Sequence, residues 1–156
     1  MPKLTDEHVL CAYVDGSDLH DVAPLIRSRL QRFIADRRWT TGQILFVDQI
    51  LDPDPDFPDF LPDWDLGINL GLDHVQLNEE WFDDIEALVE CLAGLHTETE
   101  RDFELFIAYR SRPWLQEHLI FIDDKPVDLA WFKEAISMLA KSGPSNSDNV
   151  QPPLNA

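Results

Sequence analysis

The order of hydrophobic and polar positions predicts a strand and then a helix at the start of the chain. Residues 8–14 are almost entirely apolar and end at Asp15-Gly16, which indicates a strand followed by a turn. Apolar residues then recur at helical spacing and predict a helix over residues 22–38. Pro24 fits only in its first turn, so Asp21 is the predicted N-cap. The other face of this helix carries Arg27, Arg32, Arg37 and Arg38, and with Arg29 the helix holds five of the twelve basic residues. This face is interpreted as solvated and as partly balancing the acidic half of the chain.

The rest of the chain contains a weak duplication. Residues 77–84 match residues 127–134 at an offset of fifty, each with an Asn or Asp suited to an N-cap followed by a Trp-Phe pair in the first helical turn. The strands predicted before these helices, residues 66–72 and 116–122, keep that offset. Residues 44–47 and 104–107 are instead offset by sixty. The additional residues fall between the paired strands, so the segment 52–65 is predicted to be an insertion relative to 110–115.

A strand–helix opening followed by two strand–strand–helix units predicts an α+β fold. We expect a two-layer sandwich with a mixed or antiparallel sheet of about five strands and three helices on one face, in the order βα-ββα-ββα. Residues 1–141 are predicted to form a single acidic domain, with pseudo-repeats over about 44–94 and 103–141. Residues 142–156 have the composition of a disordered tail and receive no predicted element.

Alternation along the predicted strands assigns side chains to the two faces of the sheet. The helix-facing set is Leu45, Val47, Phe103, Leu105, Ile107 and Tyr109. The other set, Ile44, Phe46, Asp48, Ile50 and Phe106, makes a second face too apolar for plain solvent. Gly67, Asn69 and Gly71 point to one side and leave a flat strip against which another chain could lie. Coverage of this face by the chain's own tail, or by a homodimer partner, is an equal alternative.

The net charge of the chain indicates its class of partner more clearly than any sequence motif does. The chain of 156 residues has a formal net charge of −18, and from Trp39 to Glu100 it places sixteen Asp and Glu without one Lys or Arg. Nucleic acids and anionic membranes require clustered basic residues, so both are excluded as partners. The hydrophobic content of 44% separates the chain from acidic disordered proteins. Its expected partner is a basic protein.

The predicted insertion is the candidate binding element, because it combines carboxylates, prolines and aromatic residues. Trp64 and Trp114 lie in equivalent hairpin connections and are expected to be near one another. Each of these two tryptophans is expected either to contact the partner or to close the end of the core. The candidate partner-binding residues are Asp52, Asp54, Asp56, Phe57, Asp59, Phe60, Asp63, Trp64, Asp65 and Trp114. Trp81 and Trp131 are instead predicted to pack at helix starts or in the core.

Motifs of catalysis and metal binding do not fit the sequence. Asp52, Asp54, Asp56 and Asp63 match positions 1, 3, 5 and 12 of a calcium loop, but Phe57 stands where that loop needs Gly. The histidines form no zinc pattern and no nucleophile motif is present, so we expect no enzyme activity, metal or cofactor. Cys11 and Cys91 are predicted to be buried, reduced thiols. With no export signal or membrane span predicted, the expected location is the cytoplasm.

In overall type the chain resembles the immunity proteins of bacterial polymorphic, type VI and contact-dependent toxin systems. The resemblance rests on the acidic α+β domain, the helix starts Trp81-Phe82 and Trp131-Phe132, and the stretch 111–123. It implies an antitoxin that occludes a cognate basic toxin in the cytosol, with a nuclease as the expected class because its phosphate groove is basic. The alternatives are a DNA mimic that inhibits a DNA-binding protein, and an acidic adaptor or chaperone for a basic client.

Overall fold

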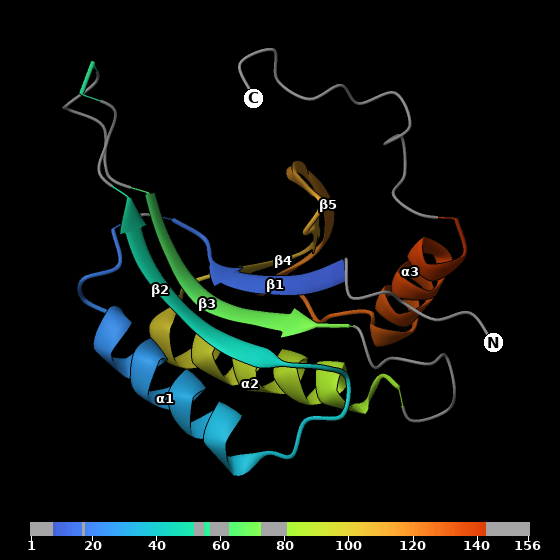
Figure 1. The fold of residues 1–156 in the computed structure, drawn as a ribbon. Coiled ribbons are helices and arrows are strands. Elements are labelled where there is room, and N and C mark those ends of the chain that lie inside the picture. Colours follow the sequence, from blue (N-terminus) through green and yellow to red (C-terminus); the bar gives the residue numbers. More distant parts are fainter. Residues whose placement is uncertain (1–7, 17, 52–54, 57–62, 73–80, 143–156) are drawn as a thin grey trace.

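The computed structural model describes residues 8–16, 18–51, 55–56, 63–72 and 81–142. Its elements are β1 (His8–Val14), α1 (Ala23–Asp36), β2 (Ile44–Leu51), β3 (Asp63–Gly71), α2 (Asp83–Thr99), β4 (Phe103–Tyr109), β5 (Arg112–Ile122) and α3 (Leu129–Ser142) (Figure 1). This α+β order confirms the predicted βα-ββα-ββα arrangement. Within the described residues, no helix has both the length and the apolar character needed to cross a membrane.

The five strands form one sheet in the order β2-β3-β1-β4-β5, and every neighbouring pair is antiparallel. Because β3 runs between β1 and β2, those two strands are parallel to each other, which is a split β-α-β unit. In Figure 1, α1 and α2 lie beneath the sheet, and α3 packs beside β5. The first strand of the chain therefore becomes the central strand, with both of its edges paired.

Alternate residues of the inner strands face the helices, as expected for a sheet with one covered face. The predicted set of helix-facing residues is correct for β4, whose Phe103, Leu105, Ile107 and Tyr109 are all buried in the main core. It is wrong for β2, where Ile44, Phe46 and Asp48 pair with the core residues Leu70, Ile68 and Leu66 of β3. Leu45 lies on the other face and is 50% exposed.

The helix starts confirm one predicted cap and correct another. The Asp128 carboxylate accepts a hydrogen bond of 3.0 Å from the N–H of Trp131, so Asp128 caps α3 as predicted. The N-cap of α1 is Val22 with no side-chain hydrogen bond, and Asp21 pairs with Arg101 at 3.0 Å instead. Trp131 is 54% exposed, which contradicts its predicted packing role. In α2 the helix begins only after Phe82, so the two helix starts differ, and Asn78 lies outside the described residues.

The arginines of the first helical segment are exposed or half-buried, in line with the predicted solvated face, and three of them pair with acids. Arg27 binds Asp48 at 2.7 Å, Arg29 binds Glu98 at 3.0 Å and Arg37 binds Asp84 at 3.0 Å. Each pair connects the first helical segment to a residue from the acidic half of the sequence. The helix layer therefore neutralises part of the negative charge with its own arginines.

The C-terminal end of α2 is held by His96. Its Nδ1 lies 2.9 Å from the carbonyl oxygen of Arg101 and its Nε2 lies 2.9 Å from the Asp124 carboxylate. A second carboxylate, that of Asp102, lies 3.4 Å from Nδ1. Only the doubly protonated imidazole can donate to partners at both nitrogens. The hydrogen bond to Arg101, then the hydrogen bond to Asp124 and the charges of Asp124 and Asp102, raise the pKa of His96 above its ordinary value.

This pKa predicts a pH dependence of stability. With a folded pKa above the unfolded value of about 6.5, His96 contributes fully below about pH 6.5. That contribution disappears as the pH rises through the folded pKa. Urea unfolding at a series of pH values should show wild type losing stability relative to His96→Gln on going from acid to alkaline solution. If the difference between the two proteins does not change with pH, the pKa of His96 in the folded state is not raised above its unfolded value.

Candidate protein-binding face

The structure describes only part of the predicted partner-binding element. Asp52, Asp54, Phe57, Asp59 and Phe60 lie outside the described residues. Asp56 lies in an exposed turn, and Asp63, Trp64 and Asp65 begin β3. Trp114 lies in β5, with its side chain outside the described part. The hairpin of β4 and β5 closes through residues 110–111 alone, whereas 52–62 separate β2 from β3, in line with the predicted insertion.

Trp64 and Trp114 do not lie near one another. Between their strands, β3 and β5, the sheet places β1 and β4, and neighbouring strands are about 4.8 Å apart. The strands β3 and β5 also run in opposite directions, so their first residues lie at opposite ends of the sheet. The duplication correctly indicates two hairpins, but it contains no information on the strand order that separates them.

Trp64 closes one end of the core, which was the second of its two predicted roles. Its side chain is only 7% exposed, and its indole N–H donates to Asp48 Oδ1 at 2.8 Å. The other oxygen of Asp48 accepts a hydrogen bond from Arg27 Nε at 2.8 Å, and the His20 ring packs edge-on against the indole. Burial raises the pKa of Asp48, but the hydrogen bonds from Trp64 and Arg27 outweigh it and hold that pKa below its ordinary value.

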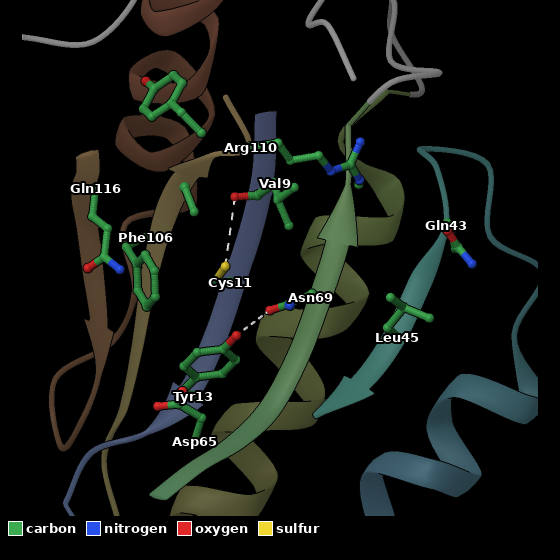
Figure 2. Close-up of a pocket in the computed structure, with 13 residues that line it drawn as sticks. Val9, Cys11, Tyr13, Gln43, Leu45, Asp65, Asn69, Phe106, Arg110 and Gln116 are labelled. Atoms are coloured by element: carbon green, nitrogen blue, oxygen red, sulfur yellow. Dashed lines mark hydrogen bonds between the residues drawn. The ribbon is translucent and has the colours of Figure 1, made fainter. Parts of the chain in front are cut away.

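The second face of the sheet has an apolar centre of its own. Val9, Cys11 and Phe106 form a buried cluster separate from the main core, and Tyr13 and Ala108 pack against it. Figure 2 shows these side chains with Leu45 on one side and Gln116 on the other. Phe106 was correctly predicted to lie on this face, whereas the alternate residues of β1 were not assigned to either face. The spacing of Val9, Cys11 and Tyr13 was the available signal.

The predicted strip of small residues lies beside this cluster. Asn69 and Gly71 line the same hollow, and the Tyr13 hydroxyl donates to Asn69 Oδ1 at 2.5 Å. Gly67 is covered, because a Cβ at that position would meet the carbonyl oxygen of Ala12 and the Tyr13 ring. Asn69 and Gly71 of the strip therefore line the hollow, whereas Tyr13 covers Gly67.

Two adjoining hollows over this face form what we call the trough. One, of about 360 Å³, lies over Val9, Cys11 and Phe106. The other, of about 470 Å³, extends toward the start of β3 and is lined by three carboxylate residues, Asp15, Asp65 and Glu104. Tyr13, Asp65, Phe106 and Gln116 line both hollows. The trough thus has an apolar centre and an acidic end, and Arg110 lines the first hollow at the end away from Asp65 (Figure 2).

One of the two cysteines lies in the trough, and its thiol is buried. Both cysteines are free, with Cys11 buried as predicted and Cys91 only half-buried. Burial raises the pKa of the Cys11 thiol to about 11, and the charge of Asp65 adds a smaller effect in the same direction. A thiol with that pKa is a poor nucleophile at neutral pH. Across the described residues, no three His, Cys, Asp or Glu side chains gather where they could hold a metal ion.

Comparison with known proteins identifies no relative. No family model, curated protein or solved structure matches the chain.

Proposed function

We propose that this protein is an immunity protein that binds and occludes a basic effector toxin in the cytoplasm. The observation that supports this most strongly is the segment from Trp39 to Glu100, which holds sixteen acidic residues and no Lys or Arg. A field of one sign steers an oppositely charged partner and raises its association rate. Among intracellular toxins, a nuclease fits best because its phosphate groove is basic.

The distribution of ion pairs supports a directional acidic surface. Arg27, Arg29 and Arg37 pair with acids around the helix layer, on one side of the molecule. At the acidic end of the trough, the described lining contains three carboxylates and neither Lys nor Arg. Leu51, after which the predicted insertion begins, and Asp65, at its end, line that same end. The described residues at the two ends of the insertion therefore adjoin the acidic end of the trough.

A DNA mimic is the less favoured alternative. Such a protein needs carboxylates spaced like phosphates along an extended surface. Here the trough combines an apolar cluster with carboxylates at one end only. That combination is typical of a protein–protein contact, in which apolar residues slow dissociation and charges speed association.

The first test uses the product of an adjacent toxin reading frame as the partner. Co-expression should restore growth, and the two proteins should co-purify. In the purified pair, replacing Asp54, Asp56, Asp59 and Asp63 by Asn should slow association by about tenfold or more and flatten its salt dependence. Stopped-flow association rates measured at several salt concentrations provide the comparison.

A matched control separates the position of the charges from their number. Asp36→Asn, Asp83→Asn, Glu86→Gln and Glu90→Gln remove the same charge from exposed positions of the helix layer. This control should change the association rate much less. Equal slowing by the two quadruple variants would show that total charge, not the insertion, governs binding. Failure of the pair to associate at all would reject the proposed function.

A further inference from the structure

We propose that the trough binds an amphipathic segment of the basic partner. An apolar side chain of that segment lies on Val9, Cys11 and Phe106, and a neighbouring Lys or Arg reaches the carboxylates at the acidic end. This inference rests on the proposed function and assigns the partner's contact to the open face of the sheet, in addition to the insertion.

The apolar half of the argument comes from the centre of the trough. Val9, Cys11 and Phe106 are between 4% and 8% exposed, so they form a continuous floor and not scattered surface residues. Leu45, at 50% exposed, stands at the β2 side of the hollow and offers further apolar area. Gly71 and Ala108, which also line it, are small, so a second backbone can approach the sheet closely.

The charged half of the argument comes from the geometry of the acidic end. Tyr13 pairs with Gly67 of β3 on one side and with Glu104 of β4 on the other, so Asp65 and Glu104 flank the Tyr13 ring from neighbouring strands. Glu104 also lies 2.9 Å from His118 Nδ1. Asp15 is exposed in the turn after β1. A cation entering from the apolar centre would meet these carboxylates in a partly desolvated setting, where charge pairs are stronger than in water.

Charge also decides between the candidate occupants of the trough. A second copy of this chain would bring another net charge of −18 against an acidic surface, which opposes association. A nucleic acid would bring phosphates and meet the same repulsion. A segment with alternating apolar and basic side chains satisfies both ends of the trough at once.

The test uses short synthetic peptides as probes of the isotope-labelled full chain. One peptide alternates Leu with Arg, a second alternates Ser with Arg, and a third alternates Leu with Glu. In NMR titrations at 0.15 M salt, where the Debye length is about 8 Å, the Leu/Arg peptide should bind saturably and shift the amides of Val9, Cys11 and Phe106. The Ser/Arg peptide should bind more weakly, and the Leu/Glu peptide should not bind.

A pair of variants tests the position. Ala108→Arg places bulk and positive charge in the trough and should weaken binding of the Leu/Arg peptide by about tenfold or more. Ala35→Arg makes the same change at an exposed position of α1 and should leave affinity within about twofold. Circular dichroism checks that both variants are folded. If Ala108→Arg is not, Leu45→Ser at the half-exposed side of the trough replaces it, with a smaller loss expected in the same direction.

Each remaining outcome overturns the inference in a different way. If the Leu/Arg and Ser/Arg peptides bind equally and shift only the insertion, the trough is not the contact, and the proposed function survives. If the Leu/Glu peptide binds equally well, the face is apolar without preference for a basic partner. A dimer in sedimentation equilibrium that Ala108→Arg dissociates would identify a second copy as the occupant. No binding of any peptide up to about 1 mM would reject the inference, while the toxin pairing test would still decide the proposed function.

Discussion

Replacing Asp84 by Ala is expected to destabilise the protein by about 3 kcal/mol or more, because a buried carboxylate is lost and its five donors, two of them on the buried Thr41, lose their acceptor. Asp84 is 2% exposed. Its Oδ2 accepts hydrogen bonds from the N–H groups of Thr40 at 2.8 Å and Thr41 at 3.0 Å, and from both threonine hydroxyls. Its Oδ1 accepts from Arg37 Nε at 3.0 Å. One carboxylate thus fixes the connection between α1 and β2 to the start of α2.

Urea unfolding of Asp84→Ala against Asp83→Ala measures this contribution with a matched neighbour. Asp83 is exposed in the same helical turn, so its loss should cost less than about 1 kcal/mol. Asp84→Asn, which keeps the shape and one acceptor, should fall between the two. Equal destabilisation by Asp84→Ala and Asp83→Ala would show that the hydrogen bonds to Asp84 add nothing beyond ordinary helix-start electrostatics.

The same carboxylate predicts sensitivity to acid. Burial raises the pKa of Asp84, but hydrogen bonds from the Thr40 and Thr41 amides and from Arg37 outweigh burial and hold that pKa below its ordinary value. A carboxylate with a depressed folded pKa stabilises the protein above its unfolded pKa of about 3.9, and this contribution is lost as the pH falls through the folded pKa. Asp84→Asn should therefore lose less stability than wild type in that acid range.

Sequence patterns predicted the order of elements well because apolar periodicity is local. β1 is one short apolar run, β4 places alternate residues in the main core, and the Asp128 cap begins α3 as expected. β2 was assigned the wrong face because its two sets of alternate residues are equally apolar. In the fold Asp48 points toward Trp64 and Arg27, which supply the donors that its burial requires. No local pattern could show those partners.

The candidate site was predicted only in part, for a related reason. Gly67, Asn69 and Gly71 were correctly placed on one face, since a strand alternates strictly. The trough itself depends on strand order, because β1 contributes Val9 and Cys11 between strands that are distant in sequence. The buried role of Asp84 was not predicted, because nothing in the sequence distinguishes it from the other acids in a chain with thirty Asp and Glu.

Replacing Trp64 by Ala is expected to cost about 3–5 kcal/mol, the range for deleting a large buried aromatic side chain. The loss removes a side chain of the main core and leaves Asp48 Oδ1 without its indole donor. For a chain of this size, the midpoint of thermal unfolding should fall by roughly 2–4 °C per kcal/mol.

Trp131→Ala is the matched control, because it removes the same type of side chain from a position that is 54% exposed. Its replacement should change stability by less than about 1 kcal/mol. A contact role for Trp64 makes the reverse prediction, in which Trp64→Ala keeps the unfolding midpoint of wild type and only speeds dissociation of the partner. Calorimetric unfolding of the two variants therefore decides whether the tryptophan at the end of the acidic insertion anchors that insertion to the core or contacts the toxin.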